Sequence, residues 1–184
     1  AFPGFESPVS PDELAGMALE PDTNVRLVQE QHDNGPWHVS YAPLDDNIFS
    51  QLPETGWTFL VTDCEKHWPE LRQLVEPFRF IPDWRIDDLM ISYAAPGGSV
   101  GPHIDEYDVF LLQLHGQRNW QIHHERTTDE VYIEGIELKI LQQFEPDEDW
   151  VLNPGDLLYL PPRIAHHGVG VGDDCMTASI GFRA

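Results

Sequence analysis

Short segments in which apolar and polar positions alternate dominate the chain after Pro82. A period of two places successive side chains on opposite faces, which is the pattern of half-buried β-strands. Strands are predicted over residues 86–94, 107–114, 119–123, 137–141, 156–160 and 176–182. Glycine or proline turns separate several of them, at residues 96–98, 115–117 and 153–155. Short strands at this spacing predict a β-sandwich or barrel.

The first eighty residues mix helical and strand patterns. Ser10 and Glu13 form a capping box around Pro11, which predicts a helix that runs to Glu20. Further predictions here are strands over residues 37–41 and 57–61, and a helix that Asp63 caps and that buries Trp68, Leu71, Leu74 and Val75. We expect these helices to pack outside the barrel.

The chain is organised as one domain. Its 184 residues suffice for a sizeable core, and they contain no repeat, low-complexity tract or linker. We therefore expect a single catalytic domain over residues 1–184, with helices and strands over about 1–80 and the barrel over about 81–184. The chain does not begin with Met, and its first residues are typical of mid-chain sequence, so we expect a fragment of a longer protein.

The net charge of −22 narrows the class of partner. Such a surface repels phosphate, which argues against direct binding to nucleic acid or to an anionic membrane and suits a basic partner. No run approaches the ~20 apolar residues of a membrane helix, and no signal peptide is visible. Cys64 and Cys175 have no ligand spacing, which favours reduced thiols in a cytoplasmic protein.

An H-x-D motif precedes the apolar run 109–112. On a β-strand, His103 and Asp105 would project from the same face because they are two residues apart. A second motif runs from Gly155 through Pro161 to His166, which we expect on the loop that leaves a strand. This spacing resembles the second metal motif of the cupin superfamily, although Arg163 stands where cupins usually carry glycine. The adjacent His167 would then point elsewhere.

Either motif alone is more often structural or solvated than ligating. Together they have the right order and lie about sixty residues apart, which predicts a triad of His103, Asp105 and His166. Two histidines and one carboxylate with open coordination positions are typical of non-haem Fe(II) oxygenases, whereas a closed zinc site would need a fourth ligand. The remaining histidines are expected to be structural or exposed: His32, His38, His67, His115, His123 and His124.

Arg118 lies thirteen residues beyond Asp105, after the predicted turn at 115–117. A hairpin of this length would return the chain into the barrel near the metal. There the guanidinium could form a bidentate pair with a dicarboxylate that chelates the metal at its other end, such as 2-oxoglutarate. By position alone, an exposed arginine at a turn is the more common arrangement.

Several longer stretches carry a more specific resemblance. They are residues 10–16, 81–93, 96–98, 100–110 and the closing Gly181–Phe–Arg–Ala184. Across them the chain resembles the bacterial JmjC-type ribosomal oxygenases, the arginine hydroxylases of large-subunit ribosomal protein L-sixteen, within the cupin superfamily. The similarity spans almost the whole chain.

This resemblance implies a mainly β fold with flanking α-helices, a double-stranded β-helix. It also implies Fe(II), 2-oxoglutarate and O2 as metal, cosubstrate and oxidant. The site residues that it implies are His103, Asp105 and His166 for iron, Arg118 for the distal carboxylate of 2-oxoglutarate, and Thr177 and Ser179 beside the cosubstrate. The implied partner is a basic ribosomal protein. Family members continue into helical dimerisation and winged-helix-like regions, so the full-length protein is expected to be a homodimer.

Tyr107 continues the alternation of His103 and Asp105 and would face the same pocket. There it could stack against a substrate arginine, or it could simply belong to the barrel core. Two other functions stay open on the sequence alone. A metal cupin that acts on a small molecule without 2-oxoglutarate requires that Arg118 point away from the metal. A non-catalytic peptide-binding barrel would keep its partner after metal removal.

Overall fold

The computed structural model describes residues 1–32 and 35–183. The side chain of His32 and all of Ala184 lie outside the described part of the chain. The helices are α1 (Pro11–Ala18), α2 (Ile48–Gln51), α3 (Cys64–His67), η1 (Pro69–Leu74), η2 (Glu76–Phe78) and η3 (Asp83–Arg85). The strands are β1 (Asn24–His32), β2 (Gly35–Tyr41), β3 (Trp57–Thr62), β4 (Ile86–Ala94), β5 (Asp108–Arg126), β6 (Glu148–Leu152), β7 (Leu157–Leu160) and β8 (Ile164–Phe182).

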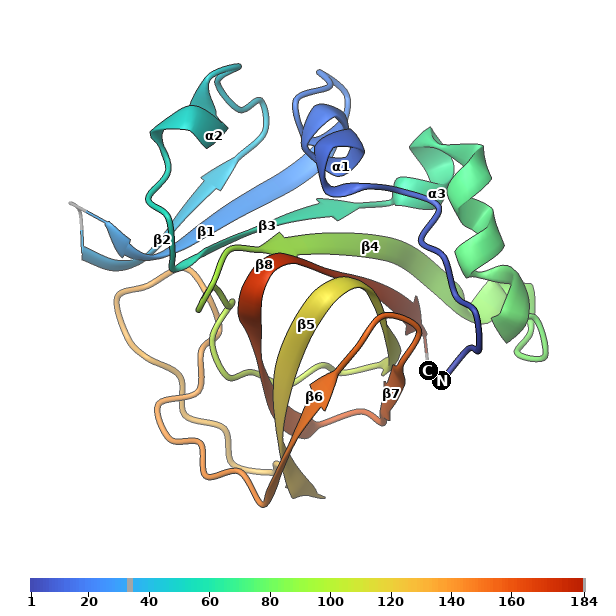
Figure 1. Cartoon of the computed structure of the whole chain (residues 1–184). Helices are drawn as coiled ribbons and strands as arrows, with labels where there is room; N and C mark the ends of the chain where they lie inside the picture. The colour runs from blue at the N-terminus through green and yellow to red at the C-terminus, as the bar shows by residue number, and fades with distance from the viewer. Residues whose placement is uncertain (33–34, 184) are drawn as a thin grey trace.

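The strands form one antiparallel sheet in the order β2-β1-β3-β4-β8-β5-β6, with β7 paired to β5. Strands β5 and β8 are long and strongly curved, and they fold the sheet over on itself (Figure 1). The fold is a double-stranded β-helix, as expected from the sequence. Strands β1, β2 and β3 extend the layer that contains β4 beyond this barrel (Figure 1).

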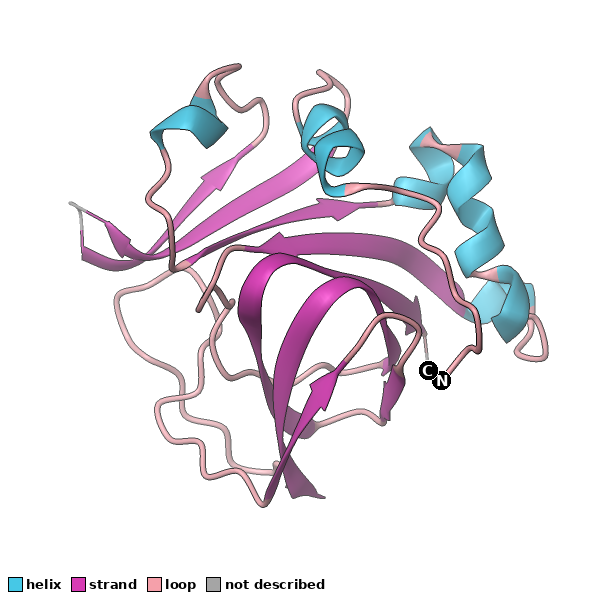
Figure 2. Cartoon of the chain, in the orientation of Figure 1, coloured by secondary structure: helices cyan, strands magenta, loops and turns pink. Residues whose placement is uncertain are grey.

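The helices lie on the outer side of the extended layer, as expected (Figure 2). Helix α1 has the predicted capping box, in which the Ser10 hydroxyl accepts from the Glu13 backbone N–H and Glu13 Oε2 accepts from the Ser10 backbone N–H. It ends at Ala18, slightly earlier than expected. Leu14 and Ala18 are buried in the larger core, which joins the helices to the sheet.

The helix expected after Asp63 is interrupted. Asp63 has φ +60° and makes no capping hydrogen bond, so α3 is only four residues long. Pro69 begins the 3₁₀ helix η1, because proline removes a backbone donor and fixes φ. Leu71 and Leu74 are nevertheless buried, as the apolar pattern predicted.

The hairpin predicted at residues 115–117 is wrong. Residues 108–126 form the single strand β5, which bends at an irregularity where Gly116 has φ +56°. A Cβ at Gly116 would lie 2.7 Å from the backbone oxygens of Asp173 and Asp174, so the close approach to β8 requires glycine. Arg118 therefore lies within a strand that continues through the barrel.

Two further differences concern extended segments. Residues 137–141 form no strand, and only the Tyr132–Leu141 bridge pairs this region. The sequence pattern also missed β1, β6 and the first half of β8, so His166 lies inside a strand and not on a loop. Among the described residues, no helix has the length and hydrophobicity that crossing a membrane would require.

Candidate metal centre

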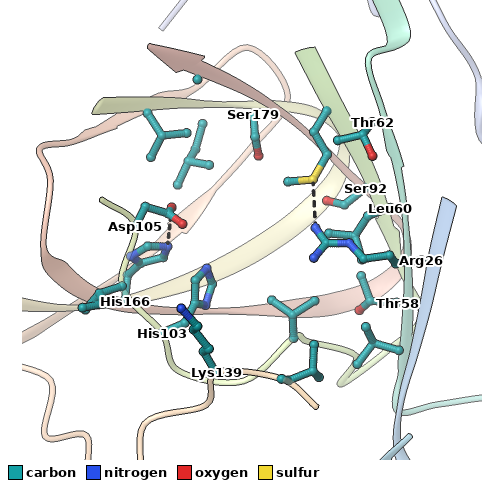
Figure 3. Close-up of a pocket in the computed structure, with 18 of the residues that line it drawn as sticks. Arg26, Thr58, Leu60, Thr62, Ser92, His103, Asp105, Lys139, His166 and Ser179 are labelled. Carbon is teal, nitrogen blue, oxygen red and sulfur yellow. Dashed lines mark hydrogen bonds and ion pairs between the residues drawn. The ribbon is translucent and has the colours of Figure 1, made fainter. Parts of the chain in front are cut away.

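His103, Asp105 and His166 come together at one end of the barrel (Figure 3). One ligand atom from each lies within 4.8 Å of the other two, and His166 Nε2 is 3.6 Å from Asp105 Oδ2. Among the described residues, these three form the one group of histidine, cysteine and acidic side chains with this geometry. The sequence-predicted triad is therefore assembled.

Backbone hydrogen bonds hold the two ligand-bearing segments together. His103 and His166 form an isolated β-bridge in which each backbone N–H donates to the other carbonyl at 2.9 Å. The Arg163 N–H donates to the Asp105 carbonyl at 2.7 Å. The H-x-D motif lies on a loop and not on a regular strand, so this bridge replaces the expected strand alternation in orienting it.

The two imidazoles present their Nε2 atoms to the centre. His103 Nδ1 lies 2.9 Å from the Gly101 carbonyl oxygen, and His166 Nδ1 lies 2.9 Å from the Ile164 carbonyl oxygen. A carbonyl can only accept, so Nδ1 carries the proton and Nε2 has a free lone pair. Burial also lowers the pKa of His166 well below its usual value, which keeps that ring neutral. These residues fit a divalent cation.

The carboxylate completes the donor set. Burial raises the pKa of Asp105, while His103 and the Tyr107 hydroxyl, which hydrogen-bonds the carboxylate, act in the opposite direction. The contact between Asp105 and His166 is not an ion pair, because the imidazole is neutral. A cation between the three side chains would supply the missing positive charge and hold the carboxylate ionised.

The triad opens into a cavity of about 390 Å³, a size suited to a small ligand or a substrate side chain. Its walls come from the barrel and from the inner face of β1, β3 and β4 (Figure 3). The lining residues from these three strands are Arg26, Val28, Thr58, Leu60, Thr62, Asp88, Met90 and Ser92. The strands before the barrel therefore help to form the pocket.

Arg118 lines the same cavity as the triad. Its side chain is only 5% exposed; Nε–H donates to Cys175 Sγ at 3.4 Å, and the guanidinium lies 5.6 Å from the Trp120 ring centroid. Nη2 is buried without a hydrogen-bond partner. A buried guanidinium with an unused donor fits an anionic ligand group. The small-molecule alternative requires Arg118 to point away from the metal; in the structure Arg118 lines the cavity that the triad also lines.

The other predicted site residues divide into two groups. Tyr107 and Ser179 line the cavity, as expected. Thr177 does not: it lies opposite Gln113 in the β5–β8 pairing, and its hydroxyl donates to Gln113 Oε1 at 2.9 Å. Thr177 lies two residues before Ser179 on β8, and its place beside the cosubstrate stays a prediction.

Four charged residues of the cavity were missed by the sequence reasoning: Arg26, Asp88, Glu137 and Lys139. Asp88 lies on the half-buried strand β4, and burial with the neighbouring carboxylate of Asp87 raises its pKa to about 6. Arg26 lies on β1. The sequence did mark Asp88, because it is a charged residue at an inward-facing position of the predicted strand over residues 86–94. No comparable signal marked Arg26, because β1 was not predicted.

The other histidines whose side chains the structure describes do not join the centre. His167 points away from it, as expected, with Nδ1 3.1 Å from Gln121 Oε1 and Nε2 3.1 Å from Ser99 Oγ. His115 Nε2 lies 3.0 Å from the Val9 carbonyl oxygen, which gives it a structural role. His123 and His124 lie beside acidic residues at the barrel edge.

Arg163 supports the loop that carries the H-x-D motif. It adopts φ +68°, a left-handed conformation that favours glycine, and its guanidinium contacts Glu106 and Glu130 at 2.6 Å. Its Nε–H donates to the Thr127 carbonyl. Glycine here would relieve backbone strain of about 1–2 kcal/mol. It would also lose the partly exposed ion pairs of Arg163, an effect of the opposite sign.

We therefore expect Arg163→Gly to leave the melting temperature nearly unchanged. Cobalt affinity should nevertheless fall about tenfold, since Asp105 loses the support of its loop. Cobalt titration and thermal melting measure the two effects. Arg79→Gln, which breaks the exposed contacts to Glu76 and Asp83, is the control. Equal cobalt affinity in both variants would contradict a positioning role for Arg163.

Residues 73–184 match the sequence profile of the JmjC domain. The chain is 45% identical over 184 residues to the ribosomal protein uL16 3-hydroxylase of Escherichia coli K12, covering all of this chain and 48% of that protein. It is 42% identical over 183 residues to a probable ribosomal oxygenase of Haemophilus influenzae, covering 99% of this chain and 45% of that protein.

Solved structures agree with the sequence comparison. The chain superimposes on E. coli YcfD with a TM-score of 0.89 and 43% identity, over all of this chain and 48% of that one. A structure of YcfD with cobalt and 2-oxoglutarate matches with a TM-score of 0.83 and 44% identity, over 99% and 46% of the two chains. The chain thus spans about half the length of the curated relatives it matches. With this profile match over most of its length, the chain belongs to the JmjC domain family.

Proposed function

We propose that residues 1–184 act as the catalytic domain of an Fe(II)- and 2-oxoglutarate-dependent dioxygenase that hydroxylates an arginyl side chain of a large-subunit ribosomal protein. One observation carries the proposal: a triad of two histidines and one carboxylate shares its cavity with the buried, incompletely bonded guanidinium of Arg118. The name and the cobalt and 2-oxoglutarate complex of the similar E. coli protein support it.

In this proposal His103, Asp105 and His166 would hold iron at the cavity, because two histidines and one carboxylate are the ligand set of non-haem iron oxygenases. The chemistry that bound iron supplies is oxidative decarboxylation of 2-oxoglutarate to succinate and carbon dioxide, coupled to insertion of one oxygen atom into a C–H bond. The protein contributes orientation and exclusion of water. Tyr107 orients the Asp105 carboxylate through its hydroxyl, and the Nδ1–H bonds fix both imidazoles.

Arg118 would anchor the distal carboxylate of 2-oxoglutarate. Its burial against Trp120 and Cys175 excludes water from that pair and strengthens the electrostatic attraction. Ser179 lines the same cavity and could donate to a cosubstrate oxygen. The cosubstrate would thus be held at both ends, which orients its 2-oxo acid group toward the triad.

The walls of the cavity suit a cationic substrate side chain. Asp88, Asp105 and Glu137 line it, and Tyr107 adds an aromatic ring. The net charge of −22 favours association with a basic ribosomal protein. As further parts of the proposal, the reaction is cytoplasmic and the full-length protein is a homodimer, both implied by the family resemblance.

The deciding experiment supplies Fe(II), 2-oxoglutarate and uL16 to the full-length protein. We expect a +16 Da mass increase on one arginine residue, with equimolar succinate. Tandem mass spectrometry locates the added oxygen, and omission of 2-oxoglutarate is the control. A +16 Da product that forms equally well without 2-oxoglutarate, or no such product, would refute the proposal.

Asp88→Asn provides a pH-dependent prediction. The folded-state pKa of about 6 lies above the ordinary aspartate pKa of 3.8, so Asp88 favours folding below pH 3.8 and loses that contribution as pH rises through about 6. Asparagine does not ionise, so the variant keeps this stability as the pH rises. After a discount for solvent screening, the stability that wild type loses when Asp88 ionises is about 1 kcal/mol. The melting temperature of Asp88→Asn should therefore exceed that of wild type by about 2–4 °C at pH 8.

At pH 4 the two melting curves should coincide. At pH 8, Asp88→Asn should bind an arginine peptide more weakly than wild type does, because the variant lacks the carboxylate anion that wild type gains above pH 6. Thermal melting and peptide binding at pH 5 and pH 8 test both effects. Asp149→Asn, at an exposed position of β6, is the matched control. A variant that is less stable than wild type at pH 8 would contradict the assignment.

A further inference from the structure

One part of the cavity has no role yet in binding iron, 2-oxoglutarate or the cationic side chain of the substrate. It is formed by β1, β3 and β4, where Arg26 pairs with Leu60 and Leu60 pairs with Ser92. Directly paired residues of neighbouring strands lie on the same face of a sheet. Thr58 lies two residues before Leu60 and therefore shares this face. Figure 3 shows this polar group across the cavity from the triad.

Arg26 directs a weakly bonded guanidinium into this space. Its Nη2 donates to Met90 Sδ at 3.8 Å, and thioether sulfur is a weak acceptor (Figure 3). No ion pair among the described residues includes Arg26, although the chain carries 32 acidic residues. A guanidinium can only donate, so a ligand here must offer an acceptor.

Thr58 supplies a second, independent observation. Its side chain is 1% exposed, and Oγ1 is buried without a hydrogen-bond partner. Leaving a buried hydroxyl unpaired is unfavourable, so such groups are uncommon unless a ligand or water satisfies them. Both Thr58 and Arg26 line the cavity and both lack a strong acceptor.

We propose that Arg26 and Thr58 form a carbonyl-binding subsite for the main chain of a peptide substrate. This inference rests on the proposed function, which brings a basic peptide to the cavity. Such a peptide has cationic side chains, so its most abundant acceptors are main-chain carbonyl oxygens. Asp88, farther along β4, and Glu137 bind the substrate cation, while Arg26 and Thr58 bind a carbonyl of the same segment. The pair thereby positions the side chain that reaches the triad.

A dicarboxylate is a poorer occupant of this subsite. Arg118 already offers a more deeply buried guanidinium inside the barrel, with an unused donor. Arg26 lies on the extension of the sheet, at the side of the cavity away from the triad (Figure 3). The subsite therefore predicts an effect on peptide affinity and none on 2-oxoglutarate affinity.

The test measures binding of fluorescein-labelled peptides that span uL16 to the full-length protein loaded with Co(II) and 2-oxoglutarate. Fluorescence anisotropy should show about tenfold weaker binding for Arg26→Gln and a several-fold loss for Thr58→Val. Valine removes only an unpaired hydroxyl, so Thr58→Val should melt at or above the wild-type temperature. Arg72→Gln removes an exposed arginine and should bind like wild type.

The outcomes separate the subsite from the proposed function. Unchanged peptide affinity in Arg26→Gln and Thr58→Val would overturn the subsite, whether or not uL16 is hydroxylated. Weaker 2-oxoglutarate binding with unchanged peptide binding would overturn it as well, because Arg26 would then contact the cosubstrate. A peptide that binds through both residues and is never hydroxylated would contradict the proposed function and support the subsite.

Discussion

Asp105→Ala is expected to abolish hydroxylation and to weaken metal binding by at least about 100-fold. Asp105 is the single anionic ligand of the triad, and its loss leaves two neutral imidazoles, which bind a divalent cation far less strongly. Removing it also exposes the open side of the centre to water. Cobalt titration measures the affinity, and succinate formation measures the coupled reaction.

The fold should survive this change. Burial raises the pKa of Asp105, which means that the ionised carboxylate destabilises the metal-free protein at neutral pH. Alanine removes that penalty, so the metal-free melting temperature should not fall. Asp149→Ala, an exposed carboxylate on β6, serves as the matched control and should retain full activity. Wild-type cobalt affinity in Asp105→Ala would show that the metal lies elsewhere.

Arg118→Gln is expected to raise the KM for 2-oxoglutarate about 100-fold. Truncating one partner of a buried charge pair costs about 3 kcal/mol, because the remaining carboxylate stays desolvated without its counter-charge. The metal-free variant should fold normally, since Arg118 makes no ion pair in the structure and Nη2 has no partner to lose. Cobalt affinity should not change.

The direct measurement is ligand-induced stabilisation. Saturating 2-oxoglutarate raises the melting temperature of a protein that binds it, and this shift should disappear in Arg118→Gln at concentrations that saturate wild type. Arg126→Gln provides the control, because Arg126 lies on the same strand at an exposed position. An unchanged KM in Arg118→Gln, or the same loss in Arg126→Gln, would reject Arg118 as the anchor.

Local chemistry made part of the fold predictable. The capping box of α1 lies within four residues, so its hydrogen bonds depend little on the rest of the chain. Apolar positions in β4 and in both halves of β5 marked these strands, and burial alternates most clearly over residues 118–123 of β5. The bend of β5 at Gly116 was not predictable in the same way. Glycine there is required by the close approach of β8, a contact between distant segments.

The candidate site shows the same division. His103, Asp105 and His166 were recognisable because the metal dictates ligand types, and the barrel fixes their order along the chain. The surroundings of Thr177 were not predictable, because they depend on Gln113, which lies on a different strand. No local pattern reports that two side chains far apart in sequence satisfy each other.

By itself, the sequence determined the ligand set, the mainly β architecture and the anionic character of the surface, since residue type, period and net charge are properties of the chain alone. Only the tertiary structure decided which polar groups share the cavity. Arg26 and Thr58 come from strands that precede the barrel, and sheet pairing brings them opposite the triad. Burial then leaves the Thr58 hydroxyl without a partner and Arg26 with a weak thioether acceptor, a condition that arises only when distant segments exclude water together.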